Sequence, residues 1–208
     1  MAESKITDLF AVPLMQVKQA VDPALIDQLV ALTRETATKS NSTSSDLSHS
    51  AVSTPDQHPL LTEVDDTMQT HIVEFGELLF GERLPWITKE IWLNQLAPGG
   101  HQTVHSHANS FISGVVYLTE AHASCRTVFY RNMGGRDFAF TNEHRDVKLG
   151  AYNAPRWAVP NQMPGDAVLF PSYLLHEVPR NQGSERMTLA FNAVPQRLKS
   201  WDYVLQFS

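Results

Sequence analysis

Two histidines separated by one residue, His105 and His107, have the spacing most suggestive of chemistry in this chain. They precede the apolar run 111–118, where a β-strand is expected, and alternate residues of a strand share a face. Two imidazoles on one face can bind one metal ion, but a distant third ligand must close the site. His176 is the candidate, because it follows a tight turn and a short apolar run at 165–172 that would bring it to a strand end.

An arginine, Arg186, follows His176 at the start of a further apolar run. An arginine that points into a barrel requires an anion, and a bound dicarboxylate would provide one through bidentate pairing. The pattern therefore predicts a metal ion and an anionic molecule in one site.

The N-terminal part of the chain predicts two helices that could support such a site. Apolar residues at helical spacing over 23–36 follow Asp22, a favourable N-cap residue. A second apolar face runs through 60–79 and ends at Gly81. Between them, 37–59 is polar and without periodicity, and we expect a mobile loop there.

From residue 87 onward the sequence favours strands, with β-branched and aromatic runs separated by Gly or Pro. These runs lie at 91–97, 111–119, 126–130, 166–170, 187–194 and 201–207. Helices followed by strands predict a mainly β fold, a jelly roll with N-terminal helices packed on one face. We expect a single domain over 1–208, with a helical part at about 20–82 and a barrel at about 87–208.

The composition excludes several classes of partner. The chain has 16 basic against 22 acidic side chains, a net charge of −6 and no basic run, so nucleic acid is not expected. Cys125 is the single cysteine, which rules out an internal disulfide and fits a reducing cytoplasm. The sequence shows neither an export signal nor an apolar run of about 18 residues, so we expect a cytoplasmic protein without a membrane partner.

The order of these motifs resembles the iron(II)- and 2-oxoglutarate-dependent dioxygenases, and within them a small bacterial and phage branch. The family pattern is His-x-Asp, a distal His, then Arg or Lys followed by Ser or Thr. Here it takes the form His-Ser-His at 105–107, His176, and Arg-Met-Thr at 186–188. Further similarities are Leu-Phe and Pro-Leu near the start, Ser-Gly-x-x-Tyr-Leu after the histidine pair, and Phe-Pro-Ser before His176, so that the resemblance runs from about Leu9 to Val194.

The resemblance implies a double-stranded β-helix, a cupin-like jelly roll, that binds iron(II) and 2-oxoglutarate. It implies His105, His107 and His176 as metal ligands, with Arg186 and Thr188 binding the cosubstrate. The implied reaction couples oxidative decarboxylation of 2-oxoglutarate to hydroxylation of a substrate that the sequence does not identify.

One position departs from the family pattern, because His107 stands where a carboxylate ligand is usual. Three neutral ligands leave the site more positive, so weaker iron(II) binding is expected, with part of the balance restored by anionic 2-oxoglutarate. Asn109 is the alternative third ligand if the register is shifted by two residues.

Other residues are candidates for the pocket. Asn94 lies on the strand that leads to the histidine pair and could reach the cosubstrate, while Tyr117 could either donate its hydroxyl to the same anion or pack in the core. The long segments 37–59 and 131–162 are expected to form pocket walls. In the second of them Arg156 and Trp157 are candidate substrate-binding residues, suited to a small molecule or peptide with an anionic group.

Two other functions compete with this interpretation. A cupin enzyme without a cosubstrate is suggested by Gly99, which five residues separate from the histidine pair. However, Phe111 and Ile112 stand where that motif requires Glu, and Arg186 would have no role. A non-enzymatic, metal-stabilised binding jelly roll would need no open coordination position. Oxygen consumption with 2-oxoglutarate separates these possibilities.

Overall fold

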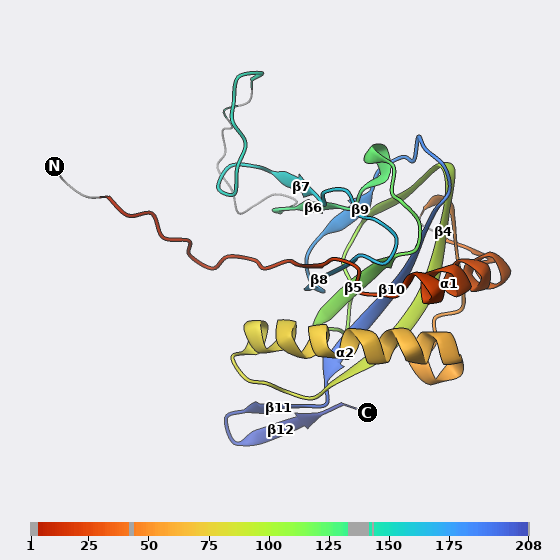
Figure 1. The fold of residues 1–208 in the computed structure, drawn as a ribbon. Helices are drawn as coiled ribbons and strands as arrows, with labels where there is room; N and C mark the ends of the chain where they lie inside the picture. Colours follow the sequence, from red (N-terminus) through yellow and green to blue (C-terminus); the bar gives the residue numbers. More distant parts are fainter. Residues whose placement is uncertain (1–3, 42–43, 133–141, 143, 208) are drawn as a thin grey trace.

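The computed structural model describes residues 4–41, 44–132, 142 and 144–207 of the chain. A curled antiparallel sheet forms a double-stranded β-helix, with two long helices beside it (Figure 1). The helices are α1 (Pro23–Thr36) and α2 (Pro59–Phe80), and the short 3-10 helices are η1 (Pro55–Gln57) and η2 (Ala123–Cys125). Among the residues described, no helix is both long and apolar enough to cross a membrane.

In the described part of the chain, nine of the twelve strands follow α2. The strands are β1 (Met15–Val17), β2 (Lys39–Ser40), β3 (Ser45–His49), β4 (Trp86–His105), β5 (Ile112–Tyr117), β6 (Val128–Tyr130), β7 (Arg156–Ala158), β8 (Ala167–Pro171), β9 (His176–Val178), β10 (Arg186–Pro195), β11 (Arg197–Ser200) and β12 (Tyr203–Gln206). The main order is β1-β8-β5-β10-β4-β9-β6-β7, with β3 also paired to β4. β11 and β12 form a separate hairpin, so the expected strand at 201–207 lies outside the barrel sheet.

The predicted helices are confirmed, together with the signals that delimit them. Asp22 caps α1 by accepting a hydrogen bond from the Ala24 N–H at 2.8 Å. α2 ends at Gly81, whose φ of 70° lies in the left-handed region that glycine tolerates, and whose N–H donates to the Glu77 carbonyl.

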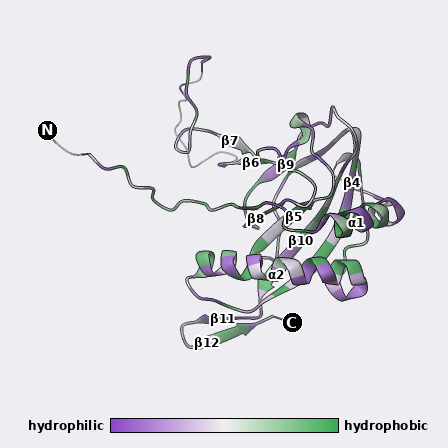
Figure 2. Cartoon of the chain, viewed as in Figure 1, coloured by the Kyte–Doolittle hydropathy of each residue, from purple (hydrophilic) through white to green (hydrophobic). Residues whose placement is uncertain are grey.

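The main sheet separates two cores because neighbouring residues of a strand point to opposite faces. Leu93, Leu189 and Phe191 face outward and share a core with α1 and α2, whereas Val168 and Phe170 face the barrel interior. Figure 2 shows the hydrophobic positions along these strands and helices. The helices thus support the outer face, and the interior is left for a functional site. We propose that the helical part and the barrel form one domain, since they share a core.

The polar segment 37–59 is not the loop that the sequence predicted. Its residues form β2 and β3, and β3 pairs with β4, after which Ser53 bridges to Ile91. The prediction was wrong because the backbone of β4 offers unpaired hydrogen-bonding groups, and pairing with them outweighs the low intrinsic strand propensity of Ser and Asp. Residues 42–43 of this segment lie outside the described part.

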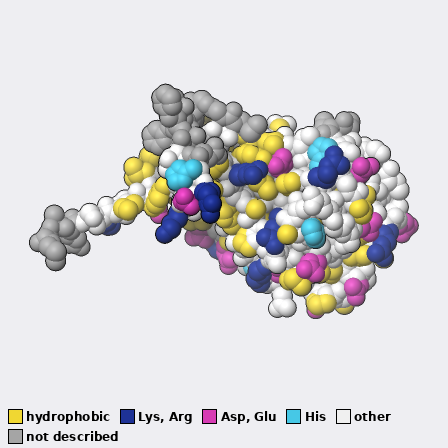
Figure 3. Space-filling view, turned by 90° about the horizontal axis from the view of Figure 1, so that it is seen from above, with side chains coloured by type: hydrophobic (Ala, Val, Ile, Leu, Met, Phe, Trp, Pro, Cys, Tyr) yellow, Lys and Arg dark blue, Asp and Glu magenta, His cyan; other side chains and the backbone are white. Residues whose placement is uncertain are grey.

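The second long segment is partly described, since 133–141 and 143 lie outside the described residues. Within it, Arg131 donates three hydrogen bonds to the carbonyls of Ala151, Tyr152 and Ala154, and this arginine is therefore engaged by its own loop. The N-terminal segment extends away from the rest of the molecule (Figure 3). The side chains of Leu9 and Phe10 in this segment are exposed.

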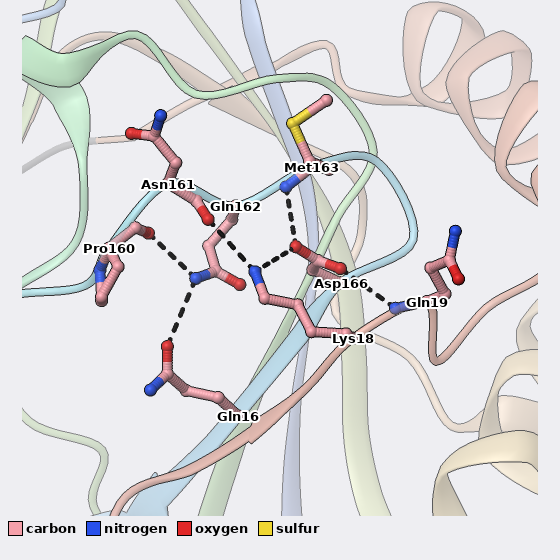
Figure 4. A network of polar contacts seen from close by, with 8 residues as sticks. All are labelled: Gln16, Lys18, Gln19, Pro160, Asn161, Gln162, Met163 and Asp166. Carbon is pink, nitrogen blue, oxygen red and sulfur yellow. Dashed lines mark hydrogen bonds and ion pairs between the residues drawn. The ribbon is translucent and has the colours of Figure 1, made fainter.

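A buried carboxylate, Asp166, ties the N-terminal strand to the turn before β8 (Figure 4). It accepts hydrogen bonds from Lys18 Nζ at 2.7 Å, from the Gln19 N–H at 3.0 Å and from the Met163 N–H at 2.8 Å. Burial alone would raise the pKa of Asp166, but these donors outweigh it and hold the pKa below its usual value.

We predict that Asp166→Asn lowers the free energy of unfolding by about 1–3 kcal/mol, because backbone donors lose a charged acceptor. Lys18→Gln, at a side chain that is 59% exposed, should cost less than about 1 kcal/mol. Urea unfolding of the two variants measures both changes. Equal losses would contradict the importance given to the two backbone donors.

Candidate metal centre

Three imidazoles converge inside the barrel at the end of β4. His105 is the last residue of β4 and pairs across the strands with His176, the first residue of β9, while His107 follows two residues later. The ring centroids lie 4.2 Å apart for His105 and His176, and 5.1 Å apart for His107 and His176. One possible ligand atom from each of the three lies within 4.8 Å of the others. The structure therefore brings together all three histidines that the sequence selected.

Each imidazole has its Nδ1 held by an oxygen outside the cluster. The acceptors are Thr103 O for His105 at 2.8 Å, Leu174 O for His176 at 2.9 Å, and Asn192 Oδ1 for His107 at 2.7 Å. A carbonyl oxygen can only accept, so each Nδ1 carries the proton and each Nε2 keeps a lone pair. These lone pairs are the atoms available to a metal ion.

Burial keeps the three rings neutral. It lowers the pKa of His176 to about 3, with the charge of a protonated His105 as a smaller cause. Burial also lowers the pKa of His105 and of His107. The Nε2 of His107 is buried and has no hydrogen-bond partner among the described residues. A neutral donor set with a buried, unpaired lone pair fits a divalent ion that accepts imidazole ligands, iron(II) included.

Asn109 is less well placed than His107 to complete the set. It is exposed and lies in a turn two residues after His107, with a φ of 57°. The geometry therefore favours His107 as the third ligand.

Arg186 supplies a buried positive charge elsewhere in the barrel. It is 5% exposed, its Nη2 donates to Thr127 Oγ1 at 3.3 Å, and its Cζ lies 5.3 Å from the centroid of the Tyr117 ring. Its Nε is buried without an acceptor, and no carboxylate of the described residues lies within ion-pair distance. A buried guanidinium in this state is suited to receive an anion.

The other predicted cosubstrate residues lie beside Arg186. Asn94, Thr188 and Tyr117 form one cross-strand row over β4, β10 and β5, and Arg186 lies two residues from Thr188 on the same face. The Tyr117 hydroxyl lies 3.1 Å from Thr127 Oγ1. Sequence analysis missed Thr127, because a single threonine just before a short strand has no distinguishing pattern.

A polar network behind His107 was also missed. Asn192 Oδ1 accepts from both His107 and the Ser113 hydroxyl, and its Nδ2 donates to Glu90 Oε2 at 2.8 Å. Gln102, whose Nε2 lies 3.4 Å from His105 Nε2, was missed as well. The available signal was the polarity of Asn192 within an apolar strand, which is unusual for a buried position.

The two predicted substrate residues lie on opposite faces of β7. Trp157 pairs with Phe129, which pairs in turn with His176, so Trp157 is on the face of the metal centre and is 44% exposed. Arg156 pairs with Tyr130 and is therefore on the other face.

The sequence matches the model of one known protein family. Residues 90–192 match the model of a family described as "Putative 2OG-Fe(II) oxygenase". No curated protein matches the sequence at a significant level.

Solved structures resemble the chain over most of its length. HygX from Streptomyces hygroscopicus, with nickel and 2-oxoglutarate bound, is 12% identical with a TM-score of 0.64, covering 88% of this chain and 83% of its own. A Pseudomonas putida prolyl-4-hydroxylase is 17% identical with a TM-score of 0.60, covering 87% and 92%. The alpha-ketoglutarate-dependent epimerase SnoN from nogalamycin biosynthesis is 14% identical with a TM-score of 0.61, covering 89% and 80%.

We predict that the metal-free protein loses stability as the pH falls below 6.5, the ordinary histidine pKa. The unfolded chain takes up a proton there, whereas folded His176 resists protonation until about pH 3, so in this window the unfolded state binds more protons. The free energy of unfolding should fall by up to about 1.4 kcal/mol per pH unit for each such histidine.

Urea unfolding in the presence of a chelator, from neutral pH to about 4, where carboxyl groups begin to titrate, measures this slope. His176→Gln should flatten it. The same slope in both proteins would refute the buried neutral state of His176.

Proposed function

We propose that this chain, which belongs to the 2OG-Fe(II) oxygenase family, hydroxylates a small-molecule or peptide substrate. The family uses iron(II) and 2-oxoglutarate, and the pair supplies O₂ activation coupled to oxidative decarboxylation of the cosubstrate. The chain's own residues then have to bind these components, orient them and exclude water.

We assign the metal to His105, His107 and His176 through their Nε2 atoms. Their Nδ1 hydrogen bonds fix the tautomer that metal binding requires. Aromatic rings surround them: the centroid of Phe170 lies 4.8 Å from that of His176, and the centroid of Trp92 lies 5.8 Å from that of His107. These rings limit access of water to the metal, which a reactive oxidation requires.

We assign the far carboxylate of 2-oxoglutarate to Arg186. The single observation that carries this function is that a buried guanidinium, without a carboxylate partner among the described residues, lies in the same barrel as three inward-facing imidazoles. Thr188, Asn94 and Tyr117 lie next to it on the same face and would complete the pocket. A cupin without a cosubstrate would not need this charge.

The proposed substrate class is supported by the structural neighbours of the chain. Structures of HygX include one with hygromycin B bound, and another neighbour is a prolyl-4-hydroxylase, so both a small molecule and a peptide are consistent with this fold. The epimerase among the neighbours makes hydroxylation one of several outcomes open to the same centre. We propose Trp157 as part of the substrate wall, and Arg156 as the residue that could hold an anionic group if the substrate extends around the edge of β7.

The proposed function predicts consumption of O₂ and formation of succinate only when both iron(II) and 2-oxoglutarate are present. His176→Ala should abolish both O₂ consumption and succinate formation, because only two of the three proposed imidazole ligands remain. An oxygen electrode and succinate analysis measure this, including the slow turnover without a substrate. Oxygen consumption that does not depend on 2-oxoglutarate would favour the cupin enzyme. No oxygen consumption at all over a broad substrate screen would favour a binding jelly roll.

Arg186→Ala should weaken 2-oxoglutarate binding by about tenfold or more, since a charge-assisted bidentate pair contributes roughly 1.5–3 kcal/mol. Metal affinity should be retained. Arg180→Ala is the matched control, because the Arg180 side chain is bound to the Gly99 carbonyl instead. Calorimetric titration of the metal-loaded proteins compares them, and equal 2-oxoglutarate affinity in all three would remove the assignment.

Trp157→Ala should slow substrate oxidation while leaving metal and 2-oxoglutarate affinities unchanged, because the residue shares the face of the centre but is not a ligand. Arg156→Ala, on the opposite face, should have the smaller effect unless the substrate is anionic. Turnover with a substrate found by screening is the measurement. Wild-type rates in both variants would exclude β7 from the substrate wall.

A further inference from the structure

The carboxylate of Glu90 is connected to His107 through the side-chain amide of Asn192. Glu90 on β4 and Asn192 on β10 are direct cross-strand partners. Asn192 accepts from His107 Nδ1 at 2.7 Å and donates to Glu90 Oε2 at 2.8 Å. The other carboxylate oxygen of Glu90 accepts from Lys89 Nζ at 3.0 Å. Asn192 is 4% exposed and the Glu90 side chain 36% exposed, so the connection runs from the buried imidazole to a carboxylate at the edge of the interior.

The orientation of the Asn192 amide is decided by Glu90, because an ionised carboxylate can only accept a hydrogen bond. Its oxygen takes donors from both His107 and the Ser113 hydroxyl, which lies 2.7 Å away, while its NH₂ group faces the carboxylate of Glu90. The reversed amide would set an oxygen against that carboxylate and an NH₂ group against Nδ1 of His107. His107 would then carry its proton on Nε2, the atom that faces the other two rings.

The charge of Glu90 also matters, because the cluster itself contains none. His105, His107 and His176 are neutral ligands, so a divalent ion among them would receive no charge compensation from the ligands themselves. A hydrogen-bonded amide between a carboxylate and an imidazole is polarised by both, and it increases the basicity of the ring.

We propose that Glu90 is a positioning residue of the metal centre: through Asn192 it holds His107 in the tautomer that binds metal and supplies the negative charge that the three ligands lack. This inference rests on the proposed function insofar as the three histidines bind a metal ion. It adds a role for a carboxylate that is not itself a ligand.

The first test is metal affinity, measured with Co²⁺ in competition with a chromophoric chelator. Glu90→Gln retains a hydrogen-bond acceptor but loses the charge, and it should weaken Co²⁺ binding by about tenfold to a hundredfold. Glu177→Gln is the matched control: Glu177 adjoins His176 in sequence, but it accepts from the Tyr130 hydroxyl and lies on the other face of β9. It should retain wild-type affinity. Circular dichroism and urea unfolding verify that the metal-free variants are folded.

The second test exchanges the two groups. Asn192→Asp alone sets two carboxylates against each other and should weaken Co²⁺ binding. Combined with Glu90→Gln, it restores one carboxylate and one amide in reversed order, and most of the affinity should return. Nitrogen-15 NMR of the metal-free proteins should report Nδ1–H for His107 in the wild type and in the double variant, and a mixture of tautomers in Asn192→Ala.

The outcomes separate this inference from the function beneath it. If wild-type protein binds no Co²⁺, or if His176→Ala binds it equally well, the metal centre is wrong. If those two proteins behave as expected but Glu90→Gln binds Co²⁺ like the wild type, or the double variant recovers nothing, the role of Glu90 is wrong while the metal centre stands.

Discussion

The donation of each imidazole Nδ1–H to an oxygen behind its ring is the interaction on which the centre depends. Without those acceptors the three rings could rotate or exchange tautomers, and their Nε2 lone pairs would not converge. Two acceptors are backbone carbonyls close in sequence to their histidine, at Thr103 and Leu174. The third, Asn192, is a side chain 85 residues away, which makes His107 the ligand most dependent on tertiary structure.

The barrel interior can contain these polar side chains because the outer face of the sheet provides much of the hydrophobic packing. The helices α1 and α2 share a core with the outward residues of β4 and β10, including Ile91, Leu93 and Phe191. The barrel interior can therefore hold polar groups such as Asn192, Ser113 and Arg186, each of which is at most 5% exposed. Buried polar groups require partners, and the described contacts provide most of them. Arg186 Nε and His107 Nε2 are among the buried polar atoms of the described residues that have no hydrogen-bond partner, and both point to a ligand.

The sequence was informative where function depends on local spacing. Capping residues delimit α1 and α2. The short intervals within the histidine pair and between His176 and Arg186 selected three histidines that the structure brings together. The sequence failed where a role depends on strand register. Glu90 and Asn192 are 102 residues apart and no motif joins them. Arg156 and Trp157 are adjacent in sequence, yet alternation separates them onto two faces.

The length of β4 has a consequence for how the protein can fluctuate. This one strand carries Glu90 and Asn94 near its start and His105 at its end, and it pairs with β10 and β3 before it pairs with β9. Backbone amides along it should exchange with solvent deuterium as one cooperative unit, because opening one part disrupts its pairing with β10, β3 and β9. Segments outside this unit, such as residues 4–14 and the β11–β12 hairpin, can open at far lower free energy. We therefore expect the three imidazoles to stay together while the periphery fluctuates, so that a molecule entering the barrel would meet them already in place.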